Sequence, residues 1–194
     1  MTPLRLAVLI SGRGSNMEAL LSAAADPAYP AKPVLVASNR PDAKGLETAA
    51  AAGIATLAID HKLYGKDREA FERALDKALT DAGTEIIALA GFMRVLTPWF
   101  VARWEGRMIN IHPSLLPKYK GLDTHQRAID AGDAEAGCTV HWVSAGVDEG
   151  EIIAQASIPI LPGDTAESLA HRLLPEEHKL YPRALALACE RIRA

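Results

Sequence analysis

This sequence has no net positive charge, and few of its side chains are aromatic. The 194 residues carry a formal net charge of -3, and only 5% of them are aromatic. Domains that bind nucleic acids usually carry a basic surface. The composition therefore argues against a nucleic-acid partner, although a local cationic pocket for a small anion remains compatible with it.

Cysteine and long apolar runs are also rare. Cys138 and Cys189 are far apart and do not form a disulfide framework, which favours a reducing compartment. No run approaches the ~20 apolar residues that span a bilayer. The apolar run at 6–10 ends too early for a signal peptide. We therefore expect a cytoplasmic protein without a membrane partner.

Apolar runs alternate with helical patterns through the first half of the chain. Strands are expected at 6–10, 34–37, 56–59, 85–90 and 108–111, and helices after Ser15, at 43–52, at 68–82 and after Pro98. This alternation predicts a parallel sheet covered by helices on both faces. Ser15 and Glu18 have the spacing of a capping box at the start of the first helix.

The second half has a different pattern. Residues 138–143 and 151–160 read as two antiparallel strands joined by a glycine-rich turn. A helical region follows at 165–192, and we expect it to be broken or kinked at Pro175 and Pro182. The fold class is thus α/β: an open, mostly parallel, twisted, Rossmann-like sheet with late antiparallel strands. No linker divides the chain, so a single domain over 1–194 is expected.

The glycine-rich loop at 11–16 lies between the first strand and the first helix. Glycines let the backbone approach a ligand, and a helix start offers free N–H groups, so a phosphate is the natural guest. A tight turn without a ligand is the alternative. A dinucleotide site is disfavoured, because Met17 stands where its third glycine belongs and Asn39 and Arg40 where its acidic residue belongs.

Asn110 and His112 follow each other at a spacing of two after the fifth predicted strand. In extended chain they point to the same side, where a carboxamide and an imidazole can stabilise an oxyanion. A turn-capping asparagine and a core histidine form the alternative interpretation. Asp148 lies in a glycine-rich turn, and it becomes functional only if it reaches His112 and favours the protonated ring.

The remaining candidates carry less weight. His125 and His141 could approach the same cleft, but helix surface and strand packing explain them equally well. Cys138 lies in a predicted strand and is better explained as a small buried residue than as a nucleophile. No His, Cys, Asp or Glu cluster has metal-ligand spacing, so no metal is expected.

Several motifs in order resemble one family. They are 10–16 (ISGRGSN), 90–96 (AGFMRVL), 110–117 (NIHPSLLP), 140–143 (VHWV) followed by Asp148 and Gly150, and Glu177-His178 ahead of Tyr181-Pro182. These motifs are spread over nearly the whole length of the chain. In these motifs the sequence is similar to the phosphoribosylglycinamide formyltransferases (glycinamide ribonucleotide transformylases), which are folate-dependent formyltransferases.

The resemblance implies the reaction and its partners. A formyl group would pass from the cosubstrate 10-formyltetrahydrofolate to the amine of 5'-phosphoribosylglycinamide, in de novo purine biosynthesis. Small molecules would be the only partners, and the chain would be a monomer or homodimer. The phosphate-binding half would be about 1–100, and the folate and catalytic half about 101–194.

The resemblance also implies a role for each matching residue. Asn110, His112 and Asp148 would be catalytic. The ribosylglycinamide phosphate would be bound by Gly14, Ser15, Asn16 and Glu177. The folate would contact Arg68, Met93, Arg94, Val95, Leu96, Asn110, Ser144, Ala145, Gly146, Val147 and Asp148.

The sequence departs from the family pattern mainly in the 118–127 loop. Lys120 replaces a usual proline, Asp123 replaces a common histidine, and Gln126 and Arg127 stand in reversed order relative to one familiar version. Three other functions stay open: formylation of a different amine or hydrolysis of formyltetrahydrofolate, a phosphate-sugar binding module without turnover, and a dinucleotide oxidoreductase.

Overall fold

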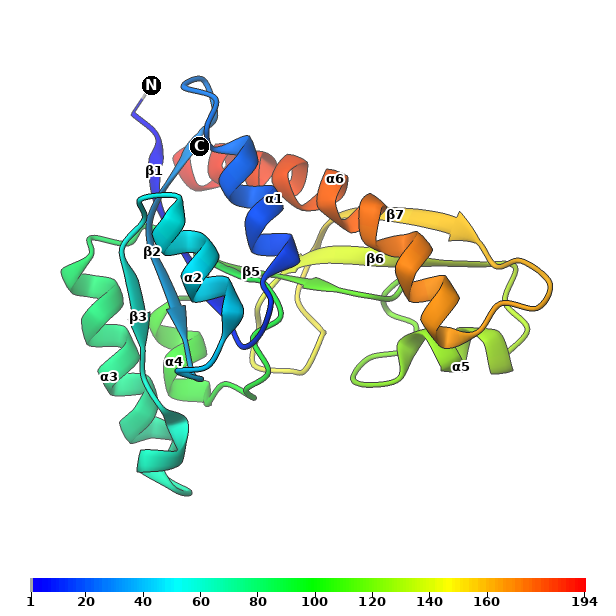
Figure 1. Cartoon of the computed structure of the whole chain (residues 1–194), viewed down its shortest axis with the longest axis horizontal. Helices are drawn as coiled ribbons and strands as arrows, with labels where there is room; N and C mark the ends of the chain where they lie inside the picture. Colours follow the sequence, from blue (N-terminus) through cyan, green and yellow to red (C-terminus); the bar gives the residue numbers. More distant parts are fainter. Residues whose placement is uncertain (1) are drawn as a thin grey trace.

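The computed structural model describes residues 2–194, in which seven strands form one sheet with helices on both faces (Figure 1). The strands are β1 (Leu4–Ile10), β2 (Ala31–Ser38), β3 (Thr56–Ala58), β4 (Ile86–Leu89), β5 (Met108–His112), β6 (Glu135–Trp142) and β7 (Ile152–Pro159). The helices are α1 (Ser15–Ala23), α2 (Lys44–Ala51), α3 (Arg68–Asp81), α4 (Pro98–Arg103), α5 (Thr124–Asp130) and α6 (Ala166–Arg193), with a 3-10 turn η1 (His61–Tyr64).

The strand order across the sheet is β3-β2-β1-β4-β5-β6-β7. Strands β1 to β5 are parallel to their neighbours, whereas β6 is antiparallel to β5 and β7 is antiparallel to β6. The predicted fold class is confirmed, including the change of direction in the late strands.

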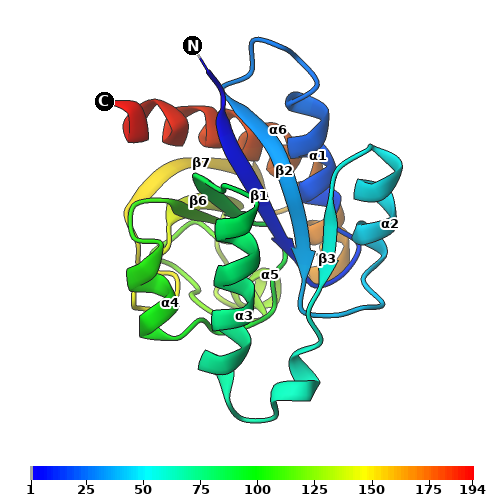
Figure 2. The same cartoon turned by 90° about the vertical axis from the view of Figure 1, so that its left-hand side faces the viewer.

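The core lies on both faces of the parallel part. Leu6, Val8 and Ile10 of β1 pack into the cluster that α1 and α6 cover. Ala7 and Leu9 point to the opposite face and pack with α3 and α4. Figure 2 shows these two helix layers on either side of the sheet. Burial on both faces explains why β1 reads as a continuous apolar run.

The border between β1 and β4 is the place where the chain order reverses. From β1 the chain proceeds through α1 to β2, and from β4 it proceeds through α4 to β5 on the other side. Open sheets bind ligands beyond the carboxyl ends of the strands at such a border. The N–H of Ser11, after β1, donates to the Gly91 carbonyl, after β4, at 3.2 Å. The two loops therefore meet at the expected ligand position.

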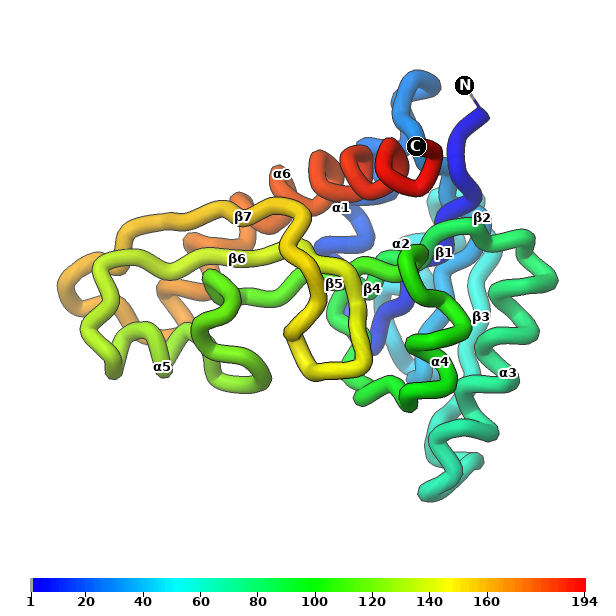
Figure 3. The backbone as a smooth tube through the Cα atoms, turned by 180° about the vertical axis from the view of Figure 1, so that it is seen from behind, coloured from blue at the N-terminus to red at the C-terminus, as the bar shows by residue number. Residues whose placement is uncertain are grey.

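Strands β6 and β7 extend away from the parallel part, with α6 along them and α5 near their far end, where Ala128 of α5 packs with Leu169 of α6 (Figure 1). In Figure 3 the yellow segment that joins β6 and β7 bends away from these two strands and lies beside β5. This connection contains Asp148. The long antiparallel pair thus brings a late turn of the chain next to the end of an early strand.

One local expectation was wrong, and one of the two alternatives for the late helix is excluded. The N-cap of α1 is Gly14, in a left-handed conformation with a φ of 73°, and no side chain caps this helix. Ser15 is the first helical residue, so it cannot form the predicted capping box. The late helix is also neither divided nor ended at its prolines: α6 runs continuously through Pro175 and Pro182.

Packing along α6 explains its continuity. An internal proline loses one helical hydrogen bond, but the buried face of α6, including Leu173 and Leu185, packs into the cluster shared with β1 and α1. Helix α5 was not predicted at all, because only Thr124 and Ala128 are buried in it and its apolar stripe is short. Within residues 2–194, no helix combines the length and the apolarity that a membrane crossing needs.

Tyr181 fixes α6 to the carboxyl ends of the central strands, and its loss should weaken the fold. Its buried hydroxyl donates to the Leu89 carbonyl at 2.7 Å. We expect Tyr181→Phe to lower the free energy of unfolding by about 0.5–1.5 kcal/mol, because it removes a buried hydrogen bond while the Leu89 carbonyl keeps its place in the ladder between β4 and β5. Urea denaturation measures this change.

Tyr64→Phe is the matched control, because the Tyr64 hydroxyl has no hydrogen-bond partner within 2–194. The Tyr64 ring packs edge-on against the Phe71 ring, with the two ring centroids 5.9 Å apart. Equal stabilities for the two variants would show that the Tyr181 hydroxyl does not anchor α6.

Candidate active site

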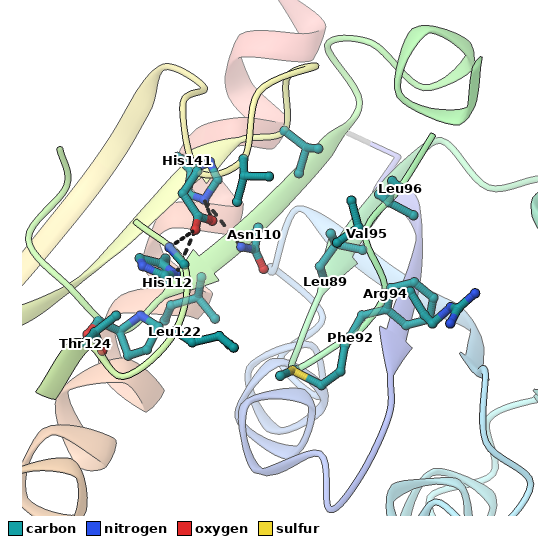
Figure 4. A pocket seen from close by; sticks show the side chains of 18 of the residues that line it. Leu89, Phe92, Arg94, Val95, Leu96, Asn110, His112, Leu122, Thr124 and His141 are labelled. Carbon is teal, nitrogen blue, oxygen red and sulfur yellow. Dashed lines mark hydrogen bonds and ion pairs between the residues drawn. The ribbon is translucent and has the colours of Figure 1, made fainter. Parts of the chain in front are cut away.

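An open cleft of about 760 Å³ lies beyond the carboxyl ends of β4 and β5. It is lined by residues from the segments 89–96, 110–113, 121–125 and 141–148, together with Asn16 of α1 and Glu177 of α6. Figure 4 shows the mainly apolar 89–96 segment on one side and the polar group around Asn110 and His112 on the other. A mainly apolar wall facing a few polar groups is typical of a small-molecule site.

The pairing of β5 with β6 builds the polar side. Asn110 and His112 share one face of β5, as their spacing predicts. In the antiparallel register Asn110 lies opposite His141, and opposite residues share a face. The Asn110 Nδ2 and the His141 Nε2 are 3.4 Å apart. His141 therefore belongs to the site, a position that the sequence left undecided.

Two hydrogen-bonding states of His141 fit its surroundings. Its Nδ1 lies 3.0 Å from the Trp142 carbonyl, which can only accept, so Nδ1 carries a hydrogen. In the neutral ring Nε2 accepts from the Asn110 amide, which keeps one hydrogen for a ligand. In the protonated ring Nε2 carries a hydrogen and faces the Asp148 Oδ1 at an ion-pair distance of 3.6 Å.

The Asp148 carboxylate is the point where three segments meet. Its Oδ2 lies 3.4 Å from the His112 Nδ1 and accepts the Gly121 N–H at 3.0 Å. Burial raises the pKa of Asp148. The His141 hydrogen bond, the Gly121 N–H and the charges of the two imidazoles outweigh that effect, and the net pKa lies below its usual value. Asp148 is therefore a half-buried group that stays ionised.

The backbone around Asp148 is unusual, and glycine makes it possible. Asp148 has a φ of 52°, in the left-handed region that few residues other than glycine adopt. A Cβ at Gly150 would lie 1.5 Å from the Trp142 carbonyl oxygen, so no side chain fits there. The backbone of this turn therefore positions the Asp148 carboxylate. Ordinary turn formation alone does not explain this geometry.

His112 is buried with an oxygen atom facing each ring nitrogen. Its Nε2 lies 2.9 Å from the Tyr119 carbonyl, and its Nδ1 faces Asp148. A doubly protonated ring satisfies both contacts with one N–H each, and a nearby carboxylate favours the positive charge. This arrangement can hold a protonated imidazole beside the cleft.

The first glycine-rich loop lies at the end of the cleft nearest α1. The start of α2 packs closely on it: the Gly45 N–H donates to the Gly12 carbonyl at 3.0 Å, and a Cβ at Gly45 would lie 2.5 Å from the Ile10 Cδ1. The first N–H groups of α1 have no helical acceptor, which suits an anion. Gly14 and Ser15 precede the lining residue Asn16 without lining the cleft themselves.

Asn16 and Glu177 form a polar pair from opposite ends of the chain. The Asn16 Nδ2 donates to the Glu177 Oε2 at 3.3 Å. The Asn16 Oδ1 is buried and has no partner within 2–194. Burial raises the pKa of Glu177, the Asn16 hydrogen bond lowers it in part, and the net pKa is raised. The pair can accept hydrogen bonds from a hydroxyl-bearing ligand. It also connects the expected phosphate-binding half of the chain with the expected folate and catalytic half.

The 93–96 segment is fixed at both ends by polar side chains. The Ser11 Oγ accepts the Met93 N–H at 2.8 Å and donates to the Asn39 Oδ1 at 2.5 Å. At the other end the buried Glu72 accepts the Thr97 N–H at 2.7 Å and also its hydroxyl. A loop held in this way can present its backbone and side chains to a ligand at little entropic cost.

Apolar side chains of this segment stay exposed. Met93 and Val95 are 69% and 64% exposed, which is unusual for residues that line a cleft in a folded domain. Arg94 also lines the cleft, and its guanidinium lies 5.8 Å from the Phe71 ring centroid. Arg68 does not line the cleft, but its side chain donates to the Val95 carbonyl at 3.3 Å.

Most predicted site residues thus gather around one cleft, and their roles stay predictions. Gly14, Ser15 and Arg68 lie just outside its lining. The sequence left His125 undecided and gave no sign that the rest of the 121–125 segment lines the cleft. Burial and the charge of His112 lower the pKa of His125. Within residues 2–194, no group of three or more His, Cys, Asp or Glu side chains is arranged to hold a metal ion.

Comparison with known proteins places the chain among formyl transferases. The sequence pattern of the family described as Formyl transferase matches residues 4–185. The phosphoribosylglycinamide formyltransferase of Escherichia coli (strain K12) is 42% identical over 94% of this chain and 86% of that protein. The trifunctional purine biosynthetic protein adenosine-3 of Bos taurus is 50% identical, but the chain spans only 18% of its length.

Solved structures are similar over nearly the whole length. The crystal structure of phosphoribosylglycinamide formyltransferase from Brucella melitensis has 53% identity and a TM-score of 0.92, over 97% of this chain and 96% of that one. Glycinamide ribonucleotide transformylase 1 from Symbiobacterium toebii has 45% identity and a TM-score of 0.93, over 97% and 88%.

The raised pKa of Glu177 predicts a pH-dependent cost of burying it. At a pH above the ordinary pKa of Glu, this carboxyl loses its proton in the unfolded chain but keeps it more readily in the folded protein. The free energy of unfolding therefore falls as the pH rises towards the pKa of the folded state. Glu177→Gln removes that cost and keeps an acceptor for Asn16. We expect its stability gain over the parent chain to be larger at pH 7.5 than at pH 4, by thermal unfolding.

Glu176→Gln is the matched control, because Glu176 pairs with Lys179 in a more exposed position on the same helix. A gain from Glu177→Gln that is the same at both pH values would rule out an ionisation cost.

Proposed function

Because this chain belongs to the formyl transferase family, we propose that it transfers the formyl group of 10-formyltetrahydrofolate to the amine of 5'-phosphoribosylglycinamide. The products are formylglycinamide ribonucleotide and tetrahydrofolate, in a step of de novo purine biosynthesis that leads to IMP. One observation carries the proposal: the Asn110 carboxamide, the His112 imidazole and the Asp148 carboxylate converge on one cleft.

The amine substrate occupies the α1 end of the cleft in this proposal. Its phosphate binds the N–H groups of Gly14, Ser15 and Asn16 at the helix start, where the helix dipole favours an anion. Its ribose hydroxyls bind Glu177, which the Asn16 amide holds in place. The glycinamide amine then points towards Asn110 and His112.

The folate occupies the side formed by the 93–96 segment and the 144–148 loop. Met93, Val95 and Leu96 offer apolar contacts, and Ser144 to Val147 enclose the opposite edge. Arg68 and Arg94 lie near the outer end of this side, where they suit the folate's carboxylates. Small molecules are the only partners that the proposal requires, and both a monomer and a homodimer are compatible with it.

Formyl transfer proceeds through a tetrahedral intermediate. The amine nitrogen attacks the formyl carbon, a C–N bond forms, and the carbonyl electron pair moves onto the oxygen. Asn110 donates a hydrogen bond to this oxyanion, and the protonated His112, whose N–H groups face Tyr119 and Asp148, stabilises it through its positive charge. The oxyanion then reforms the carbonyl, the bond from the formyl carbon to N10 breaks, and N10 takes a proton as the amine nitrogen loses one. Water or His112 carries that proton.

Asp148 maintains the charge that this sequence of events needs. An ionised carboxylate 3.4 Å from the His112 Nδ1 stabilises the imidazolium and holds the ring in place. Holding both substrates together in one cleft contributes further rate enhancement, because the reaction no longer pays the entropy of bringing them together.

The direct test mixes the protein with 10-formyltetrahydrofolate and 5'-phosphoribosylglycinamide. We expect equal amounts of formylated product and tetrahydrofolate. Release of formate without formylated product would indicate hydrolysis instead. Binding of the phosphoribosyl compound without any turnover would indicate a binding module.

Asp148→Asn should reduce kcat strongly and leave the Kd of the amine substrate nearly unchanged, because the carboxylate contacts His112 and not the substrate phosphate. Steady-state kinetics and equilibrium binding separate the two effects. Asp164→Asn is the control, since Asp164 also has a lowered pKa but lies at the start of α6. Full turnover by Asp148→Asn would remove this residue from the mechanism.

Asn110→Ala removes one donor to the oxyanion. Such a loss typically reduces kcat by about 10²–10³-fold. The expected result is a kcat reduced by that order with KM little changed, measured on protein whose thermal unfolding matches the parent chain. An unchanged kcat would show that Asn110 does not stabilise the transition state.

A further inference from the structure

The 118–123 segment supplies two backbone groups to the site. The Tyr119 carbonyl faces the His112 Nε2 at 2.9 Å, and the Gly121 N–H donates to the Asp148 Oδ2 at 3.0 Å. These contacts hold His112 and Asp148 from the side opposite to β6. The geometry of a single short loop therefore sets two of the hydrogen bonds around the reacting groups.

This loop has backbone geometry that needs support from outside. Tyr119 and Asp123 both have a φ of 56°, in the left-handed region. Such conformations cost on the order of 1 kcal/mol each and persist only when the surroundings enforce them. Contacts that hold the loop are therefore necessary for its two groups to stay aimed at His112 and Asp148.

Arg127 of α5 makes such contacts on both sides of Gly121. Its guanidinium donates to the Lys120 carbonyl at 2.7 Å and to the Leu122 carbonyl at 3.1 Å. It also lies 5.2 Å from the Tyr119 ring centroid, a cation–π distance. These contacts go to the loop and not to the carbonyls at the end of α5, so they do not serve as a helix cap.

We propose that Arg127 is a positioning residue for the formyl transfer proposed above, acting through the backbone of Tyr119 and Gly121. By bridging the carbonyls on either side of Gly121, the guanidinium fixes the direction of the Gly121 N–H. By covering the Tyr119 ring, it fixes the carbonyl that faces His112. The inference rests on the proposed function for its kinetic consequence but not for its structural one.

A second tie holds the same loop from the facing side and can be separated from the first. The Lys120 Nζ lies 3.0 Å from the Glu149 Oε1. The Glu149 side chain lies across Gly146, where a Cβ would meet its carboxylate at 2.0 Å. This ion pair joins two exposed side chains and is expected to be weak. It keeps the two loops together without fixing the peptide groups around Gly121.

The test compares Arg127→Gln and Arg127→Lys with the parent chain. Gln126→Ala is the matched control, because Gln126 donates to Asp130 on the same helix at 2.7 Å and does not touch the loop. We expect Arg127→Gln to lower kcat about 10- to 100-fold with little change in KM, as small misplacements of catalytic groups do. Arg127→Lys should recover only part of this loss, because an ammonium lacks the planar guanidinium that lies over the Tyr119 ring.

A second readout does not depend on turnover. The Gly121 N–H is one of the groups that lower the pKa of Asp148, so loosening it should raise that pKa towards its usual value. Carbon-13 NMR of labelled aspartate in the free protein follows this titration. The other charged groups around Asp148, which are His112, His141 and the Lys120–Glu149 pair, are unchanged in the variants.

The outcomes separate the inference from the proposed function. A raised Asp148 pKa together with a lowered kcat supports it. If Arg127→Gln leaves the Asp148 titration unchanged, or changes only thermal stability as Gln126→Ala does, the inference is wrong. If Arg127→Gln does not fold, Arg127→Lys must show the same two effects. A parent chain without formyl transfer would overturn the proposed function, and the NMR result would still decide whether Arg127 positions Asp148.

Discussion

A half-buried negative charge organises this site. The Asp148 carboxylate lies between the imidazoles of His112 and His141 and accepts one backbone N–H, that of Gly121. Removing a carboxylate from water is costly unless it is paired and hydrogen-bonded. The elements that surround it, β5, β6 and the 118–123 loop, each contribute one of its contacts. The position of each of them is therefore tied to the same charge.

The sheet determines which residues can meet at that charge. The antiparallel register of β5 and β6 places Asn110 opposite His141, and a slip by one residue would turn their side chains to the apolar face. The border between β1 and β4 brings Ser11 next to the 93–96 segment. One architecture thus aligns a polar catalytic side with an apolar binding side, without any single segment containing the whole site.

Local patterns in the sequence were sufficient for the parallel part of the fold. The continuous apolar run of β1 and the 3.6-residue stripe of α3 are patterns that depend on near neighbours only. Asn110 and His112 could be paired for the same reason. His141 could not be assigned, because its partner depends on a strand register formed between distant segments. Helix α5 and the left-handed Tyr119 were missed because neither leaves a periodic apolar signal.

Gly150 limits how this site can vary during evolution. A side chain there would overlap the Trp142 carbonyl. Gly150 therefore cannot be replaced without moving the Asp148 carboxylate. The preceding Ala145 and Val147 are exposed at the rim, where a changed side chain meets no comparable steric obstacle. New ligand preferences in this scaffold are therefore expected to arise by changes at the rim, while the chemistry behind it is inherited unchanged.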